Sequence, residues 1–503
     1  MIDPRTPVIV GVGQRSQRID DPTQALEPID LLAEAARAAG DDAGAPGLAA
    51  AADTVAVVDM VSWNYPDAGA LLARRLGREA PVRTVTTTLG GNSPQLLVNE
   101  LAPEVARGEA DVVLIGGAEC VYTRWRARRE PKVWLEWTRA DDPPCPRVVG
   151  DGRAGTNDYE MAHAAVAPTL IYPLLETAVR SATGRGVDEH QEQVSELWAG
   201  FAEVAASNPY AWSREAYSAA AIRTPTAENR IVTFPYTKRM CANIDVDQAA
   251  ALLLCSYEAA RRAGVADDRL VFPRAGANAS DHFFFSERSS LAESPAIRIA
   301  AEAALGAAGA GVDDVARFDL YSCFPAAVQI AMKALGLPRA AGDDRPLTVT
   351  GGLAFAGGPA NDYPSHAIAA MVEACRRDPG SLGLVHALGW YVTKHSVGLY
   401  STAPPARGFA RVEPAATQAA VDALPGRELA GSYEGEATVE ATAVAFERDG
   451  SPSMAIVSLL TPDGRRALAN ARDPGVMTAM TEEAWEGRTV RLRSDGASNV
   501  VDV

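Results

Sequence analysis

The stretch from Val85 to Glu119, VTTTLGGNSPQLLVNELAPEVARGEADVVLIGGAE, limits the possible folds of this chain more than any other feature. The β-branched run 85–88 predicts a buried strand. A glycine-rich turn follows, in which Asn92 or Ser93 is suited to cap a helix. The apolar run 111–116 predicts a second strand after that helix. The result is a strand–turn–helix–strand unit whose helix directs its positive dipole end into a tight turn.

The second half of the chain repeats this plan. Leu347–Gly352 predicts a strand that ends in glycines, and a turn leads to Pro359. A helix over 366–376 and a strand over 382–386 complete the unit. Duplicated units of this kind predict an α/β protein with two similar sheets and helices around them.

Two further regions depart from the repeat. A long excursion, residues 121–235, separates the halves. From Ala437 onward the pattern predicts three strands, a helix and two strands, which is the order of an OB-fold barrel. This segment lacks the basic, aromatic face on which single nucleic-acid strands stack, so nucleic-acid binding is not expected.

Composition excludes several other classes of protein. The chain of 503 residues is long enough for about three domains, and its formal charge of -17 argues against nucleic acid and anionic membranes. No apolar run reaches the length of a membrane span, and the N-terminal residues lack a signal-peptide layout. The six cysteines form no C-x-x-C pair. We therefore expect reduced thiols, no metal site and a cytoplasmic location.

The order of these motifs resembles that of the thiolase superfamily. Gly116–Glu119 matches the G-G-x-E that closes a strand in thiolases, and Asp247–Leu254 resembles their D-G-A-A-A strand. The whole chain resembles thiolase-like proteins with an added C-terminal OB-like domain, including relatives of the sterol-carrier-protein type. The resemblance implies an α/β fold of duplicated βαβ units in α-β-α-β-α layers.

The resemblance also implies domain bounds. Residues 1–120 and 231–264 would form the thiolase N-terminal half, and residues 121–230 would form the inserted loop domain. Residues 265–408 would form the C-terminal half. Residues 425–503 would form the small barrel.

Thiolase chemistry needs four groups that this chain lacks at the matching positions. The nucleophilic cysteine falls on Gly90 or Gly91, and the histidine of the G-H-P turn falls on Gly358. Tyr321 replaces the histidine of the H-D-x-F turn, and Ala387 replaces the cysteine of C-x-G. Glycine can neither accept an acyl group nor move a proton, so we expect no thiolase reaction.

Other residues near the same turns could carry a different reaction. Cys323 stands two residues after Tyr321 and could be a relocated nucleophile, although such a cysteine is usually a small core residue. His386 ends a strand, and His395 is the preferred base, unless backbone carbonyls simply satisfy its ring. Lys394 could hold a phosphate or carbonyl oxygen.

One arginine cluster stands out in this acidic chain. It occurs where thiolases build the loop domain that holds the coenzyme A nucleotide, and it comprises Arg124, Arg126, Arg128 and Arg129 around Trp125. Arginines suit phosphates, and Trp125 or Trp134 could stack on adenine. The alternative is a solvated surface loop.

Three hypotheses of function follow. The first is a thiolase-fold protein that binds coenzyme A or acyl-CoA without the thiolase reaction of lipid metabolism. The second is an acyl-CoA acyltransferase or thioester hydrolase that uses His395, His386 and Cys323. The third is a non-catalytic partner subunit that docks on another protein through its barrel. A monomer and a homodimer are both compatible with the sequence.

Overall fold

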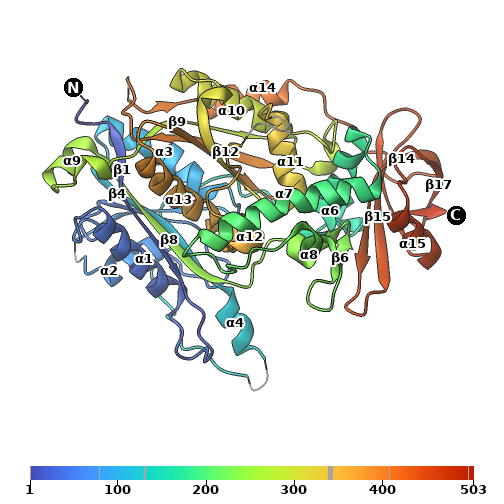
Figure 1. Ribbon diagram of the computed structural model, residues 1–503, viewed down its shortest axis with the longest axis horizontal. Helices are drawn as coiled ribbons and strands as arrows, with labels where there is room; N and C mark the ends of the chain where they lie inside the picture. The colour runs from blue at the N-terminus through green and yellow to red at the C-terminus, as the bar shows by residue number, and fades with distance from the viewer. Residues whose placement is uncertain are drawn as a thin grey trace.

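The computed structural model describes residues 2–78, 80–129, 132–337, 344–406, 408–496 and 498–502. Two mixed sheets and the helices around them form the main body, and a small barrel lies at the end of the molecule that holds the C-terminus (Figure 1). The first sheet has the order β1 (Pro7–Ser16), β8 (Asp247–Ser256), β4 (Val112–Cys120), β2 (Thr54–Val57), β3 (Arg83–Thr87) and β5 (Val148–Val149). The second has the order β10 (Val315–Leu320), β11 (Leu382–Gly389), β12 (Lys394–Ser401), β9 (Phe272–Ser280) and β13 (Ala410–Arg411).

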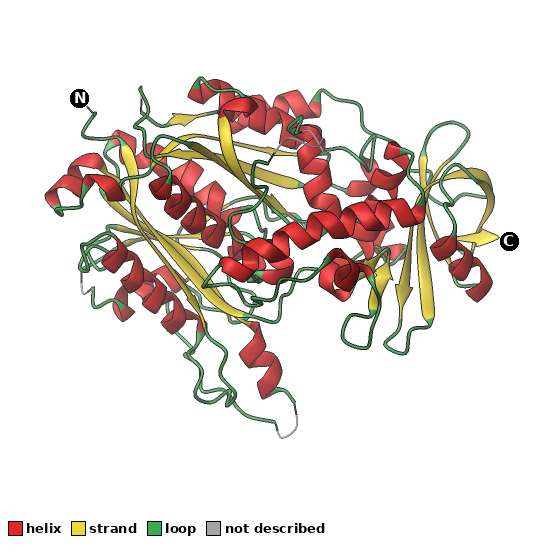
Figure 2. Cartoon of the chain, in the orientation of Figure 1, coloured by secondary structure: helices red, strands yellow, loops and turns green. Residues whose placement is uncertain are grey.

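Helices fill three layers around these sheets (Figure 2). Between the sheets lie α3 (Ser93–Arg107) and α13 (Tyr363–Arg377), each of which contacts strands of both. On the outer face of the first sheet lie α1 (Pro28–Asp42) and α2 (Ala68–Arg75), whereas α10 (Pro295–Ala308) covers the second. The predicted α/β fold with α-β-α-β-α layers is therefore confirmed.

The remaining helices connect or cover these layers. They are α9 (Tyr257–Arg262), α11 (Pro325–Ala334), α12 (Gly352–Phe355) and α14 (Pro414–Asp422). Short 3-10 helices occur at Lys238–Met240, Asp267–Arg269, Phe285–Glu287, Val312–Asp314 and Ala360–Asp362. No helix in the described part of the chain is both long and apolar enough to cross a membrane.

The strand predicted over Leu347–Gly352 does not form, and this prediction was wrong. The segment runs beside β10, and the Leu320 amide donates to the Leu347 carbonyl at 3.0 Å. Its own polar groups turn instead to the buried carboxylate of Asp319, which accepts from the Thr348 hydroxyl at 2.9 Å and from the Val349 amide at 2.9 Å. A buried carboxylate that collects such bonds competes with a regular ladder.

The inserted region folds mainly as helices. These are α4 (Val121–Ala127), α5 (Asp158–Ala162), α6 (Pro168–Thr183), α7 (Val187–Ser207) and α8 (Ala219–Arg223). Of these, α4 projects away from the body beyond the end of β4, whereas α6 and α7 run toward the barrel (Figure 1).

The C-terminal region forms the predicted OB-like barrel. Its elements are β14 (Gly435–Phe446), β15 (Pro452–Leu460), β16 (Arg466–Ala471), α15 (Pro474–Glu482), β17 (Thr489–Ser494) and β18 (Asn499–Asp502). Neighbouring strands follow the circuit β14–β15–β16–β18–β17–β14, so the five strands close on themselves. The closed circuit surrounds an apolar core of its own.

The barrel is attached to the rest of the chain by contacts that the sequence pattern did not indicate. Strands β6 (Ile231–Phe234) and β7 (Tyr236–Thr237), from the end of the inserted region, extend its sheet beside β14. The fully buried Arg466 binds Glu440 at 2.7 Å within the barrel and donates to the Ser286 carbonyl at 2.9 Å outside it. A hydrogen bond from this buried arginine therefore spans the junction.

Candidate functional site

The glycine turn between β3 and α3 is the place where the resemblance puts a nucleophile. The Gly90 amide donates to Asn361 Oδ1 at 2.9 Å, and Asn361 Nδ2 donates to the Asp59 carbonyl at 2.9 Å. A Cβ atom on Gly91 would lie within 3.0 Å of the Tyr321 hydroxyl oxygen and 2.5 Å from the Leu388 carbonyl oxygen. These atoms take the space that a cysteine side chain would need.

Cys323 is a buried thiol on the far side of Tyr321. Burial raises its pKa to about 12, and a hydrogen bond with the Tyr172 hydroxyl only partly opposes that rise. The Tyr172 ring stacks on Phe324 with ring centroids 4.6 Å apart. Because the thiolate is the nucleophilic form, a thiol with this pKa is poorly suited to attack a thioester at neutral pH.

The other two positions that match thiolase catalytic residues carry no titratable group. The Gly358 amide donates to the Asn243 carbonyl at 2.8 Å, and a Cβ atom there would lie 3.2 Å from the same oxygen. Ala387 is fully buried in β11 and lies opposite Ser396 of β12.

His386 and His395 form a buried pair. Nε2 of His386 lies 3.1 Å from Nδ1 of His395, and Nε2 of His395 lies 3.3 Å from Asp281 Oδ2. Burial, followed by the charge of His395, holds the pKa of His386 well below its ordinary value. Burial would raise the pKa of Asp281, but its hydrogen bond and ion pair with His395 lower it. Within the described residues, the side-chain hydrogen bonds of this pair reach neither the glycine turn nor Cys323, although His395 lines the same cavity as Asn92.

Lys394 is the candidate that does lie beside the glycine turn. Its Nζ donates to the Leu89 carbonyl at 2.5 Å and to the Asp151 carbonyl at 3.1 Å. Burial lowers its pKa to about 8. The side chain lines a cavity of about 330 Å³ together with Asn92.

Asn92 was expected to cap α3 with its side chain, but it does not. It occupies the N-cap position in a helical backbone conformation, without a side-chain cap bond. Its Nδ2 donates to Ser396 Oγ at 3.4 Å, and its Oδ1 is buried without a hydrogen-bond partner. The sequence indicated Asn92 only as a helix cap, because the orientation of its amide depends on contacts with β12.

The arginine cluster on α4 does not converge on one point. Arg124 donates to the Ser62 carbonyl, Arg126 lies 3.6 Å from an Asp20 carboxylate oxygen, and Arg129 stacks on Trp125 at 3.2 Å. Arg128 and Trp125 are exposed to solvent. Arg124 lines a groove of about 440 Å³ that is formed mainly by residues 60–66.

That groove also contains a residue the sequence did not single out. Arg139 lines it opposite Arg124, and its guanidinium lies 5.6 Å from the ring of Trp134, which is 76% exposed. In the described residues neither arginine is paired with a carboxylate. The groove therefore offers two cations, and the exposed indole of Trp134 lies beside one of them, Arg139, outside the groove's own lining.

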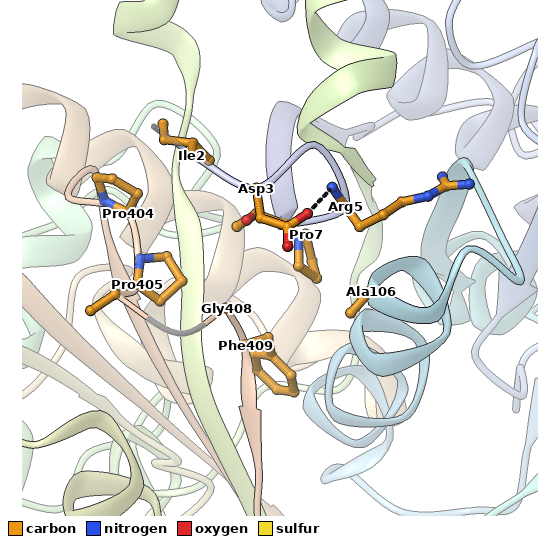
Figure 3. A pocket seen from close by; sticks show the side chains of 11 residues that line it. Ile2, Asp3, Arg5, Pro7, Ala106, Pro404, Pro405, Gly408 and Phe409 are labelled. Atoms are coloured by element: carbon orange, nitrogen blue, oxygen red, sulfur yellow. Dashed lines mark hydrogen bonds between the residues drawn. The ribbon is translucent and has the colours of Figure 1, made fainter.

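A third cavity, of about 620 Å³, lies near the N-terminus (Figure 3). Pro404, Pro405 and Phe409 line it from one side, and Asp3 and Arg5 from the other. The Arg5 amide donates to Asp3 Oδ1 at 2.8 Å, and its guanidinium pairs with Asp111, so these charges are already engaged. Among the described residues no cluster of three His, Cys, Asp or Glu side chains is placed to hold a metal ion.

Comparison with solved structures defines the class of protein. The human mitochondrial 3-ketoacyl-CoA thiolase, solved in complex with CoA, is 17% identical, covers 80% of this chain and 100% of its own, and superposes with a TM-score of 0.55. The Ltp2-ChsH2(DUF35) aldolase is 19% identical over 79% of this chain and 98% of its own, with a TM-score of 0.59. The main body is a thiolase fold.

The particular family follows from a closer likeness. A monomeric SCP2-thiolase-like protein type 1 from Mycobacterium smegmatis is 35% identical, covers 100% of both chains and superposes with a TM-score of 0.85. Residues 416–497 match the family described as Thiolase-like protein type 1 additional C-terminal domain. The chain belongs to the SCP2-thiolase-like proteins of type 1. A comparison with curated proteins finds no match.

Proposed function

We propose that this protein binds coenzyme A or an acyl-CoA and does not catalyse the thiolase reaction. The observation that carries the proposal is the filled space at Gly91, where the Tyr321 hydroxyl and the Leu388 carbonyl stand in place of an acylated side chain. A covalent acyl intermediate needs both a nucleophile and room for the acyl group. The turn offers neither.

The groove beside Arg124 supports the binding half of the proposal. Arg124 and Arg139 can each donate to phosphate oxygens, and Trp134, which lies beside Arg139 but outside the groove's lining, can stack on a purine that extends past Arg139. The groove begins at Met60, directly after Asp59, and Asn361 bridges Asp59 to Gly90. A nucleotide held in the groove would thus place its pantetheine arm toward the glycine turn. The human thiolase solved with CoA supports CoA as the ligand class to test.

Calorimetric titration with CoA tests the binding half. We expect Arg124→Ala and Arg139→Ala each to weaken binding about tenfold, the effect of losing one charge-assisted hydrogen bond. Arg488→Ala is the matched control, because that arginine lies on the barrel in an exposed pair with Glu483. Equal affinity for CoA in the wild type and the three variants, or no binding by the wild type, would refute the proposal that CoA binds in this groove.

Thioester turnover tests the catalytic half. The purified protein should show no thiolysis of acetoacetyl-CoA above a no-enzyme control. Hydrolysis or transfer from an acyl-CoA would instead support the alternative reaction by Cys323, His386 and His395. In that case Cys323→Ala and His395→Ala should abolish turnover, whereas full activity in both variants would exclude those residues.

A further inference from the structure

The small cavity beside the glycine turn contains a lysine whose surroundings differ from those of a surface lysine. Lys394 is only 4% exposed, and the residual opening is toward the cavity of about 330 Å³. Its two hydrogen-bond acceptors are the backbone carbonyls of Leu89 and Asp151, and no carboxylate pairs with it in the described residues. The Asp151 carboxylate is instead held by Arg153 at 2.6 Å.

This environment favours the neutral amine. Burial lowers the pKa of Lys394 to about 8, so about one molecule in ten carries a free amine at pH 7. A neutral primary amine is a nucleophile toward carbonyl carbon, and a desolvated lysine is the usual way in which proteins produce one.

A second observation points independently to a ligand. Asn92 lines the same cavity, is 6% exposed, and has a buried Oδ1 atom without a partner. A Cβ atom built on Gly90 would lie 2.6 Å from this oxygen and 2.8 Å from Lys394 Nζ, so both atoms border one point. A buried acceptor without a donor is costly, and a ligand hydroxyl or amide would satisfy it.

We propose that Lys394 forms an imine with a small aldehyde or ketone in this cavity, and that Asn92 Oδ1 accepts the hydroxyl group of the carbinolamine. The proposal goes beyond CoA binding and does not depend on it. The size of the cavity favours a small ligand, because about 330 Å³ is at the lower end of ligand-site volumes.

The reaction balances without an added reactant. The lone pair of Lys394 Nζ forms a bond to the carbonyl carbon, and the carbonyl π electrons move to oxygen. A proton passes from nitrogen to that oxygen, which yields the carbinolamine. The C–O bond then breaks, the nitrogen loses its second proton, and hydroxide and proton leave as water. The imine is the product, and neither an oxidant nor a reductant takes part.

Reductive trapping tests the proposal in the full-length protein. The chain has four lysines, Lys132, Lys238, Lys333 and Lys394, so peptide mass mapping can assign every adduct. Incubation with propionaldehyde or pyruvate and sodium cyanoborohydride at pH 7 should label Lys394 at least tenfold more than Lys333, which is exposed and paired with Glu293 at 2.7 Å. The rate should rise with pH through about 8.

Two variants separate an imine site from a structural cation. Lys394→Arg keeps the positive charge and the donors to both carbonyls, and it should fold but give no adduct at that position. Asn92→Ala should keep the lysine yet slow trapping about tenfold, which is the loss of one hydrogen bond to the carbinolamine. Equal labelling of Lys394 and Lys333, or no labelling of Lys394, would overturn the proposal. If the rate of trapping at Lys394 is the same in Asn92→Ala as in the wild type, Asn92 does not accept a hydrogen bond from the carbinolamine.

Discussion

Restoring the missing cysteine is the most direct test of how the glycine turn is built. In Gly91→Cys the new Cβ would overlap the Tyr321 hydroxyl and come within 2.5 Å of the Leu388 carbonyl oxygen. Overpacking a filled core typically costs about 1–3 kcal/mol. Because one of the obstructing atoms belongs to the backbone of β11 and cannot rotate away, we expect a cost of at least about 3 kcal/mol.

The measurement is the free energy of unfolding in denaturant for the wild type and for Gly91→Cys. Gly91→Ala is measured too, because it adds the Cβ atom alone. Gly200→Ala is the matched control, because a Cβ atom there meets nothing within 4 Å and the position lies inside α7. That substitution should stabilise the protein by about 0.5–1 kcal/mol through the loss of backbone freedom in the unfolded chain.

Thiolysis completes the test. Gly91→Cys should remain inactive toward acetoacetyl-CoA, since no histidine stands at Gly358 to activate the thiol. A Gly91→Cys protein as stable as the wild type would show that the turn has room for a side chain. Acylation of the new cysteine would show in addition that a thioester can reach it, and the reasoning from a filled site would then fail.

Two further substitutions test the buried charges. Arg466→Met removes one partner of the buried pair with Glu440, so it should lower the free energy of unfolding by about 3–5 kcal/mol and make the barrel more sensitive to proteolysis. The double variant with Glu440→Leu should recover most of that lost stability. Arg465→Ala, which breaks an exposed pair, should lower the free energy of unfolding by less than about 1 kcal/mol. Burial raises the pKa of Glu119 from 4.5 to about 7, so the folded state keeps a proton that the unfolded state releases above about pH 4.5. The free energy of unfolding is therefore highest below about pH 4.5 and falls, by at most about 3 kcal/mol, as the pH rises through 7. Denaturant titrations from pH 5 to 7.5 should show a shallower pH dependence in Glu119→Gln, and identical slopes would contradict that pKa.

Local sequence patterns were sufficient to predict the main helices and strands of the fold. The run at 85–88, the turn after it and the strand at 112–120 are each specified by residues close together in the chain. The same holds for the barrel, where turn signals separate alternating strands. The predicted strand over 347–352 failed because its competitor, Asp319, lies outside any local window. The pairing of β6 with β14 joins residues more than 200 positions apart and carries no local signal.

The same distinction between local and long-range contacts separates the site features that the sequence indicated from those that it did not. Counting residues from Glu119 places the lost nucleophile at the glycine turn, and Lys394 was recognised as a polar residue near it. The lowered pKa of Lys394, the orphan oxygen of Asn92 and the role of Arg139 all depend on the close approach of separate segments. Such approaches are properties of packing, so residue type alone could not indicate them.

The four lost thiolase groups, which are separate substitutions in the sequence, are not independent in the structure. Tyr321 stands where the resemblance places a histidine, and its hydroxyl fills the space over Gly91, one of the two positions where the resemblance places the cysteine. One substitution therefore obstructs the other. Shortening Tyr321 would still not reopen the site, because the Leu388 carbonyl oxygen remains 2.5 Å from the required Cβ position. Recovery of a nucleophile at Gly91 would require β11 to move, so the loss at that position is fixed by backbone position as well as by residue type.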